Sequence, residues 1–230
     1  MSDPFLDHPE GWVVTTLSPN KELGFIESVD SGGTPSTAND DFWDGDIPWL
    51  TPKEISRSSG ELYVSKTERN ISIEGLQRSS AKLLPAGTVM LCKRAPVGPV
   101  AVAAIPMATN QGFLNFQCGP KLLPAYLAYW LIANERYLLA VANGSTYPEL
   151  YKGDLFEFEI AVPPIEIQQK ILKVIAAAKQ LALCLDAKTH SVIDISDVTK
   201  LQSLRLKIEN FYYSLLPIVM SGRLVDRFTL

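Results

Sequence analysis

The sequence has 230 residues, 47% of them hydrophobic and 20% charged, with a formal net charge of −4. This composition is ordinary for a globular protein and allows one large domain, or one domain with an appendage. No uncharged apolar run reaches the roughly 18 residues that a membrane span needs. The N-terminal segment MSDPFLDHPE is acidic, whereas a secretory signal begins with basic residues and continues with apolar ones. We therefore expect a cytoplasmic protein with no membrane partner.

The three cysteines, Cys92, Cys118 and Cys184, lie far apart in the sequence. Their odd number and their spacing fit neither a disulfide framework nor a zinc site. We interpret them as buried thiols with no redox or metal role.

Charge is strongly segregated along the chain. Residues 1–51 carry ten acids and one base, Lys21, whereas residues 52–98 carry eight bases and four acids. The eight bases are Lys53, Arg57, Lys66, Arg69, Arg78, Lys82, Lys93 and Arg94. A cluster of bases in an acidic chain fits a surface that faces phosphates, and it fits a solvated protein face equally well. Charge alone does not separate these two interpretations.

Up to about Val162, short apolar runs alternate with turn signals, which predicts strands and loops. The turn signals are SGGTP (31–35), WDGDIP (43–48), LPAGT (84–88) and APVGP (95–99). The runs TVMLCK (88–93) and VAVAAI (100–105) predict two buried strands joined by a tight connection. Residues 123–142 are apolar on most faces, with Pro124 in the first turn, and predict one core helix.

The stretch FWDGDIPWLTPKEI (42–55) follows neither the period of a strand nor that of a helix. It contains two tryptophans, Trp43 and Trp49, and large aromatic side chains in an aperiodic run indicate an ordered loop. The two rings either anchor this loop in the core or form a surface that stacks on a ligand.

The pattern changes after Pro163 and Pro164, where apolar residues recur at the a/d spacing of a coiled coil. The first set is Ile167, Ile171, Val174, Ala178, Leu181 and Leu185, and the second is Leu201, Leu204, Ile208, Phe211, Leu215 and Ile218. The second set is displaced by one residue from the register of the first, so AKTHSVIDISD (187–197) predicts a bend, or a second helix capped by Ser196 or Asp197. Gly222 is expected to end the helix. An apolar stripe usually packs on its own domain, but two narrow stripes after a domain that has its own core favour a protruding coiled coil.

The sequence contains no recognisable catalytic arrangement. His8 lies near the N-terminus and His190 in the expected helix break, so neither is well placed as a general base or metal ligand. No glycine-rich phosphate loop is present. Residues 162–165 lack the polar and aromatic residues of an amino-methyltransferase motif, and the only Asp/Glu-x-Lys is Asp186-Ala-Lys188 in the helical segment. We expect a chain that binds and does not catalyse, with no metal site.

The ordered set of motifs resembles the specificity subunit of type I restriction-modification systems. The pieces are SGGTPST (31–37), FWDGDIPWLTPKEI (42–55), ISIEGLQRSSAKLLPAGTVMLCKRAPVG (71–98), TNQGF (109–113), NGSTYPELYKGDLFEFEIAVPPIEIQQKI (143–171) and SLLPIVMSGRL (214–224). Together they cover nearly the whole chain, and the Pro-Pro-x-Glu-x-Gln step before a long helix is the most specific. One departure is that Ile167 separates Glu166 from Gln168, where the family usually has Glu-Gln.

The resemblance implies an α+β fold. It places a globular target-recognition domain with a mixed β-sheet and packed helices at residues 1–162, a helical coiled-coil arm at 163–222 and a C-terminal tail at 223–230. Complete subunits of the family carry two recognition domains and two helices, so this chain resembles a half-length form with one of each. Two copies are then expected to pair antiparallel through the a/d residues given above, as a homodimer.

The implied function is recognition of double-stranded DNA at a bipartite, palindromic site, without catalysis. Methyltransferase and restriction subunits are the implied protein partners. S-adenosylmethionine is expected on the methyltransferase, and no cofactor is expected on this chain. The alternative hypothesis is an interaction protein that docks on those subunits and modulates them without reading DNA.

Under this resemblance most of the clustered bases become candidates for DNA contact, namely Lys53, Arg57, Lys66, Arg69, Arg78, Lys93 and Arg94. Arginine suits a base edge because its planar fork matches the two acceptors of guanine, whereas lysine more often meets phosphate. Trp43 and Trp49 are then interpreted as anchors, because readout of a duplex relies mainly on polar side chains. Asn110, Gln111, Ser145 and Thr146 are interpreted as capping and turn residues.

Overall fold

The computed structural model describes residues 9, 11–55, 61–94, 96–142 and 148–192, with the backbone alone at 181–192. The chain divides into two compact units. One unit consists of residues 14–160, and the described residues on either side of it belong to the other. The larger unit contains both principal sheets and all the described basic candidates.

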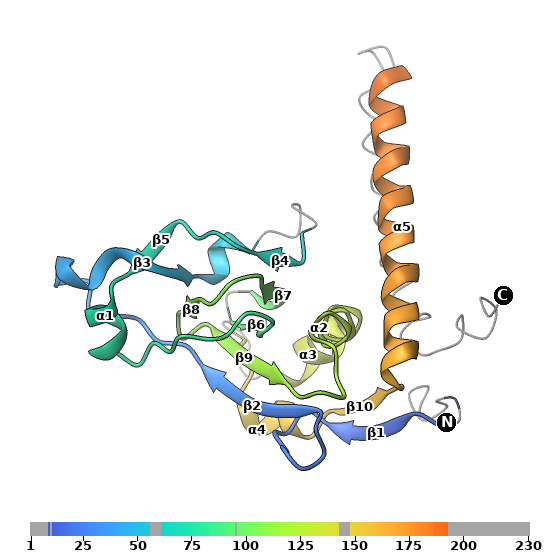
Figure 1. Cartoon of the computed structure of the whole chain (residues 1–230), viewed down its shortest axis with the longest axis horizontal. Helices are drawn as coiled ribbons and strands as arrows, with labels where there is room; N and C mark the ends of the chain where they lie inside the picture. The colour runs from blue at the N-terminus through green and yellow to red at the C-terminus, as the bar shows by residue number, and fades with distance from the viewer. Residues whose placement is uncertain (1–8, 10, 56–60, 95, 143–147, 193–230) are drawn as a thin grey trace. The chain divides into compact units, whose positions relative to one another are not determined.

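A five-stranded mixed sheet forms the centre of the larger unit (Figure 1). Its strands, in spatial order, are β2 (Ile26–Ser31), β9 (Phe113–Cys118), β6 (Val89–Lys93), β7 (Val97–Ala103) and β4 (Tyr63–Val64). The first four are antiparallel to their neighbours, and β4 lies parallel to β7. Together with the helices, this sheet confirms the predicted α+β domain with a mixed sheet.

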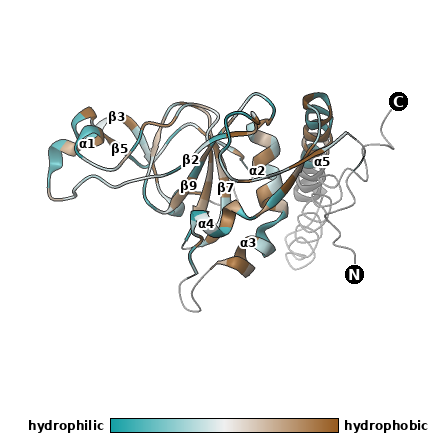
Figure 2. Cartoon of the chain, turned by 90° about the horizontal axis from the view of Figure 1, so that it is seen from below, coloured by the Kyte–Doolittle hydropathy of each residue, from teal (hydrophilic) through white to brown (hydrophobic). Residues whose placement is uncertain are grey.

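The hairpin β6–β7 corresponds to the two buried strands predicted from the apolar runs. All seven residues of β7 are buried, because α2 (Pro124–Ala133) and α3 (Glu135–Val141) pack against it. Figure 2 shows the apolar colouring of β7 and α2 in this region. The connection is shorter than predicted because Val97, Gly98 and Pro99 already belong to β7. Gly98 adopts φ 114°, a conformation that favours glycine.

The single core helix predicted over residues 123–142 is wrong, because the structure has two helices that meet at Asn134. Asn134 leaves the helical conformation at φ −102° and ψ 14°, ending α2 and preceding α3. Its side-chain amide donates to the carbonyl oxygen of Trp130 at 2.8 Å, which satisfies a carbonyl at the end of α2. Local side-chain bonding of this kind competes with helix continuation.

A second sheet of three strands contains the tryptophan-rich stretch. Its central strand, β3 (Trp43–Leu50), lies between β5 (Arg69–Ile71) and β8 (Ala108–Thr109). β3 is antiparallel to β5 and parallel to β8. The prediction of a turn at residues 43–48 and of a loop over 42–55 is therefore wrong for most of this stretch.

The turn-like residues of β3 form a bulge. Both Trp43 and Ile47 pair with Ile71, so the three residues between them have no partner of their own on β5. Asp44 has φ 58°, an uncommon conformation for a residue other than glycine. A methyl group on Gly45 would come within 2.5 Å of the Cα atom of Ser72, so the bulge requires glycine there. The bulge explains why the stretch shows no period.

β3 separates two clusters of the hydrophobic core, because neighbouring strand residues point to opposite faces. Leu50 belongs to the cluster that includes Met90, Met107 and Phe113. Trp43 and Trp49 belong to the other cluster, with Phe42, Ile71, Ala81 and Ala108.

Short elements complete the larger unit and its connections. They are η1 (Asp40–Phe42), η2 (Pro52–Glu54), α1 (Ile73–Gln77) and α4 (Lys152–Phe156), together with the two-stranded sheet of β1 (Val13–Thr16) and β10 (Glu159–Val162).

The helix α5 (Ile165–Val192) begins directly after the two prolines, as the sequence pattern predicts. The backbone amides of Ile167 and Gln168 donate to the carbonyl oxygen of Pro164 at 2.9 Å and 3.0 Å. α5 continues through residues 187–192, so the expected bend does not interrupt this part of the segment. The residues from 193 onward, including Ser196, Asp197, the second a/d set and Gly222, lie outside the described residues.

The side chains of α5 follow the predicted a/d positions only in part. Ile171 is fully buried in the chain itself, while Ile167, Val174 and Ala178 are partly exposed. Gln168 and Ile175, which are not a/d residues, are also buried. Leu181 and Leu185 belong to α5, but their side chains lie outside the described residues. Pairing with a second helix stays a prediction.

Candidate nucleic-acid interface

The described bases of residues 52–98, which are the DNA-contact candidates and Lys82, fall into those that form an ion pair with an acid and those that do not. Arg78, the C-cap residue of α1, pairs with Glu74 at 3.0 Å, and both side chains are more than half exposed. Lys82 pairs with Asp30, and the hydrogen bond from Lys82 lowers the pKa of the Asp30 carboxyl below its usual value. These two bases are therefore compensated locally.

Lys93 and Arg94, at the end of β6, share one acid. Nζ of Lys93 lies 2.8 Å from Oε1 of Glu149, and Nη1 of Arg94 lies 4.0 Å from Oε2 of the same carboxylate. The Lys93 side chain is only 16% exposed. The backbone amide of Leu150 donates to the carbonyl oxygen of Lys93 at 2.9 Å, so backbone and side chains together hold this segment against β6. Sequence analysis missed Glu149, because it lies far from its partners in the chain.

The three other described candidates, Lys53, Lys66 and Arg69, are exposed. Within the described part of the chain, no carboxylate lies at ion-pair distance from any of them. Their charges are therefore available to an external anion or dipole. Arg57 lies outside the described residues.

These three bases belong to one edge of the three-stranded sheet. Lys53 follows the end of β3, and Lys66 precedes the start of β5, which is antiparallel to β3. The ends are tied together by two hydrogen bonds, from the Trp49 amide to Oγ1 of Thr67 at 3.1 Å and from the Glu68 amide to Oε1 of Glu54 at 2.6 Å. We call Lys53, Lys66 and Arg69 the β3–β5 basic edge.

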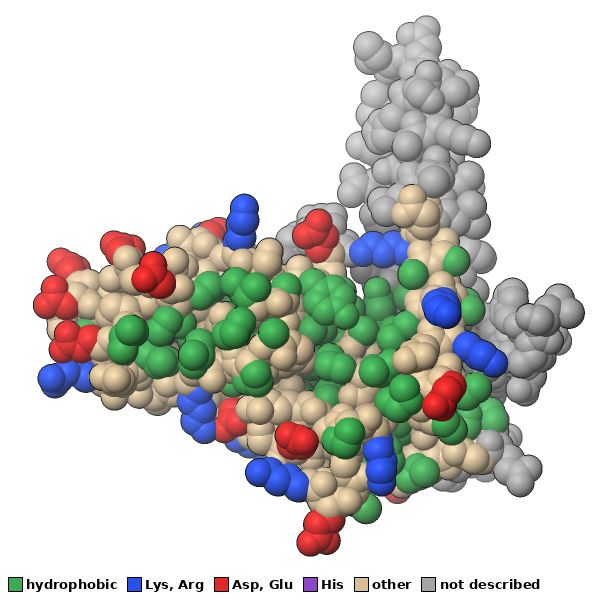
Figure 3. Space-filling view, viewed as in Figure 1, with side chains coloured by type: hydrophobic (Ala, Val, Ile, Leu, Met, Phe, Trp, Pro, Cys, Tyr) green, Lys and Arg blue, Asp and Glu red, His purple; other side chains and the backbone are tan. Residues whose placement is uncertain are grey.

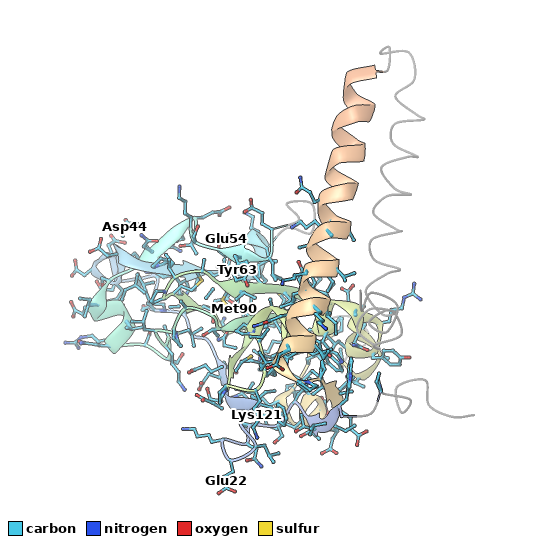
Figure 4. All side chains as sticks on the ribbon, turned by 45° about the vertical axis from the view of Figure 1, so that its right-hand side comes forward. Glu22, Asp44, Glu54, Tyr63, Met90 and Lys121 are labelled. Atoms are coloured by element: carbon cyan, nitrogen blue, oxygen red, sulfur yellow. The ribbon has the colours of Figure 1, made fainter. Side chains whose placement is uncertain are left out.

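Glu54 organises the backbone at this edge. Its Oε2 accepts hydrogen bonds from the Thr51 amide at 2.8 Å and the Thr51 hydroxyl at 2.7 Å, while its Oε1 accepts from Glu68. The carboxylate is thus engaged with neighbouring chain and does not pair with the bases within the described residues. Figure 4 shows Glu54 on the side of this sheet away from Asp44.

Trp43 and Trp49 anchor β3, as the sequence analysis expected. Their side chains are 7% and 5% exposed, and their rings meet edge to face with centroids 5.1 Å apart. Nε1 of Trp43 donates to the carbonyl oxygen of Ser36 at 3.1 Å, and Nε1 of Trp49 donates to that of Gly33 at 2.9 Å. Rings held in this way lack the free faces that stacking between bases requires. One face of Trp43 is covered by Arg69, whose guanidinium carbon lies 3.5 Å from the ring centroid.

The motifs SGGTPST (31–37) and TNQGF (109–113) meet beside β8. The Gly33 amide donates to the carbonyl oxygen of Thr109 at 2.9 Å, and the Thr34 hydroxyl donates to Oε1 of Gln111. A methyl group on Gly32 would come within 2.2 Å of the carbonyl oxygen of Asn110, so this close approach requires glycine. Oδ1 of Asn110 accepts from the Gly112 amide at 2.8 Å, as expected of a turn residue.

The opposite end of the three-stranded sheet is acidic. Asp40 and Asp41 lie in η1, and Asp44 and Asp46 lie in the bulge of β3, all exposed. Figure 3 shows acidic side chains gathered over the end of the domain that carries β3 and α1. Exposed acids therefore lie at the end of the three-stranded sheet opposite Lys53 and Lys66.

Cys92 is buried and Cys118 is half-buried, and both environments disfavour the thiolate. Burial raises the pKa of Cys92 to about 12, and burial together with the charge of Glu27 raises that of Cys118 to about 12. The side chain of Cys184 lies outside the described residues. In the described part of the chain, no cluster of His, Cys, Asp or Glu side chains is arranged to hold a metal ion. No helix there has the length and apolar character of a membrane span.

Two solved structures have a fold similar to that of this chain. A chain in a structural study of complex assembly and conformational transition of the type I R-M system superposes with a TM-score of 0.60 at 20% identity, covering 93% of this chain and 47% of that one. The HsdS subunit of Thermoanaerobacter tengcongensis gives a TM-score of 0.57 at 18% identity, covering 94% of this chain and 46% of its own. At sequence identities of 18% and 20%, these superpositions show a similar fold.

Sequence comparison shows the family. The MjaIX type I restriction enzyme specificity subunit of Methanocaldococcus jannaschii is 40% identical over 171 residues, covering 73% of this chain and 38% of that protein. The EcoR124I/EcoR124II specificity subunit of Escherichia coli is 31% identical over 162 residues, covering 67% and 39%. The chain therefore spans about two fifths of the length of these relatives. The model of the type I restriction modification DNA specificity domain matches residues 9–189, and the chain belongs to this family.

Proposed function

We propose that this chain is a non-catalytic DNA-recognition subunit that directs methyltransferase and restriction subunits of a type I restriction-modification system to their target. The support is the family membership and the name of the relatives, which are specificity subunits. The larger unit is the recognition domain, in the range of residues 1–162, and α5 begins the helical arm assigned to residues 163–222.

The observation that carries this proposal is the β3–β5 basic edge. Lys53, Lys66 and Arg69 are exposed and uncompensated within the described residues, although the chain as a whole is acidic. Phosphate contacts by such bases supply the sequence-independent part of DNA affinity. We assign Lys93 a structural role, because its side chain is 16% exposed and lies 2.8 Å from Glu149. Arg94 is 40% exposed and shares that single carboxylate at 4.0 Å, so it stays a candidate for DNA contact.

We further propose that two copies pair through their helical arms, so that each copy presents one recognition domain. A two-fold pair of identical chains reads the same sequence in opposite senses, so the target is an interrupted palindrome. The described part of the arm, the 28 residues of α5, is about 42 Å long at a rise of about 1.5 Å per residue. That length is enough to hold two half-sites apart by about half to one helical turn of DNA.

The test is to co-produce the chain with its methyltransferase partner in a host without other adenine methylation and to map the modified adenines by single-molecule sequencing. The expected motif consists of two identical half-sites in inverted orientation with an unread gap. An asymmetric or continuous motif contradicts the pairing of identical chains. A methyltransferase that modifies the same sites with and without this chain contradicts DNA recognition and supports a modulating protein instead.

A further inference from the structure

Arg69 differs from the other bases in being held in one orientation. Its guanidinium carbon lies 3.5 Å from the centroid of the Trp43 ring, a close cation–π contact. The residue is exposed, and no carboxylate lies at ion-pair distance within the described part of the chain. The charge is therefore oriented by an aromatic face and is not neutralised by an acid.

The aromatic face under Arg69 is itself fixed. Trp43 is 7% exposed, donates from Nε1 to the carbonyl oxygen of Ser36, and packs edge to face on Trp49. Trp49 is in turn held by the carbonyl oxygen of Gly33. Two indole rings, each with its N–H bonded to the backbone, make a rigid support beneath an exposed guanidinium.

The backbone of Arg69 is fixed as well. Arg69 pairs with Trp49 across β5 and β3, and its carbonyl oxygen accepts a hydrogen bond from the Thr67 hydroxyl at 2.8 Å. Arg69 is thus held both at its backbone and at its guanidinium group. An arginine ordered before binding loses less conformational entropy when it forms directed hydrogen bonds.

The guanidinium group is planar by delocalisation, and contact with a fixed ring restricts its orientation, so that its N–H groups can meet two acceptors side by side. In DNA, O6 and N7 of guanine in the major groove offer this pair, as do two oxygens of a phosphate. The acids around Arg69 favour contact with an uncharged guanine over contact with a phosphate. Glu68 precedes Arg69, and Asp44 follows Trp43, the residue whose ring Arg69 covers; the charges of both acids oppose a phosphate.

We propose that Arg69 contacts a guanine edge in each half-site and that Trp43 is the positioning residue that orients it. This inference rests on the proposed DNA-recognition function and adds to it a named determinant of sequence specificity. Lys53 and Lys66, which have flexible side chains at the same edge, contact phosphates.

The experiment uses the full chain with its methyltransferase partner and measures the base preference at each position of the methylated motif. The variants are Arg69→Lys, Arg69→Ala, Trp43→Phe and Trp43→Leu, with Lys53→Ala as the matched control from the same edge. Both Arg69 variants should weaken the preference for guanine at one position per half-site by roughly tenfold to a hundredfold. Arg69→Lys is informative because it keeps the charge and removes the planar fork.

The Trp43 variants separate positioning from folding. Trp43→Phe retains an aromatic face and should keep the motif, whereas Trp43→Leu should relax the same position as Arg69→Ala. If thermal unfolding shows that Trp43→Leu no longer folds, Trp43→Met takes its place, because methionine also lacks an aromatic face and adapts to an irregular space; it too should relax the same position as Arg69→Ala. Lys53→Ala should lower methylation at all sites alike and leave the motif unchanged.

Two outcomes overturn the inference while leaving the proposed function intact. One is a motif whose guanine preferences survive in both Arg69 variants. The other is a uniform loss of methylation at all sites in both variants, which identifies Arg69 as a phosphate contact. By contrast, a wild-type complex that methylates without any sequence motif refutes the proposed function itself.

Discussion

Replacing Lys93 and Lys66 separately by methionine distinguishes a structural base from a DNA-facing base. Methionine keeps much of the length of the side chain and removes the charge. Lys93 is 16% exposed and lies 2.8 Å from Oε1 of Glu149, whereas Lys66 is exposed without an ion pair among the described residues. The two variants therefore remove the same charge from opposite environments.

The expected loss for Lys93→Met follows from these contacts. A hydrogen bond between charged groups contributes about 1.5 to 3 kcal/mol. Arg94, at 4.0 Å, still compensates part of the Glu149 charge, and methionine recovers some apolar packing. We expect a net loss of about 1 to 2 kcal/mol, which lowers Tm by about 2 to 8 °C for a chain of this size. Lys66→Met should change stability by less than about 0.5 kcal/mol.

DNA binding should respond in the opposite way. Each phosphate contact contributes about 0.9 to the slope of log K against log salt concentration, so Lys66→Met should reduce the slope by about that amount. Lys93→Met should leave it unchanged. The assays are thermal unfolding of the chain, and anisotropy titration of labelled duplex with the methyltransferase complex at about 50 to 200 mM salt. A Lys93→Met variant with unchanged Tm and a reduced slope would refute the structural role of Lys93.

Three further outcomes are expected. Val174 lies at a partly exposed a/d position, and light scattering should show that Val174→Glu converts a dimer near twice 25.3 kDa into a monomer without loss of Tm. A wild-type chain that is a monomer at micromolar concentration contradicts the paired arm. Asp30→Asn should cost less than about 1 kcal/mol of stability at pH 7. The lowered pKa of Asp30 means that its charge stabilises the fold above the ordinary pKa of 3.8 and that this stability is lost as the pH falls below that value. The difference in stability between the variant and the wild type should therefore vanish in acid. The Cys92 thiol, with its pKa raised to about 12, should resist alkylation at pH 8 until the chain is unfolded, and rapid modification of the folded chain would contradict its burial.

Local chemistry explains which parts of the fold the sequence could predict. The hairpin β6–β7 was predictable because two apolar runs flank a short segment rich in proline and glycine. The role of Trp43 and Trp49 as anchors followed from their size and from the polar nature of duplex readout. The start of α5 was predictable because two prolines precede a regular apolar spacing.

The misses share a non-local cause. The residues Asp44, Gly45 and Asp46 carry a turn composition, yet the pairing of Trp43 and Ile47 with Ile71 of β5 makes them a bulge within a strand. The compensation of Lys93 by Glu149 depends on a contact between distant segments, so a count of charges could not reveal it. Asn134 is the exception, since asparagine inside an apolar helix is itself a local signal of a break.

The pairing of β3 with β8 has a consequence for biosynthesis. Trp49 pairs with Ala108 and Ile26 pairs with Cys118, whereas the β6–β7 hairpin joins Val89 to Val102. Domains fold as synthesis proceeds at about 5 to 20 residues per second, so β3 leaves the ribosome several seconds before β8. During that interval the tryptophan-rich strand has one edge unpaired, and pairing between distant segments is intrinsically slow. A nascent chain stalled before Ala108 would therefore leave the edge of β3 at Trp49 and Leu50 without its strand partner.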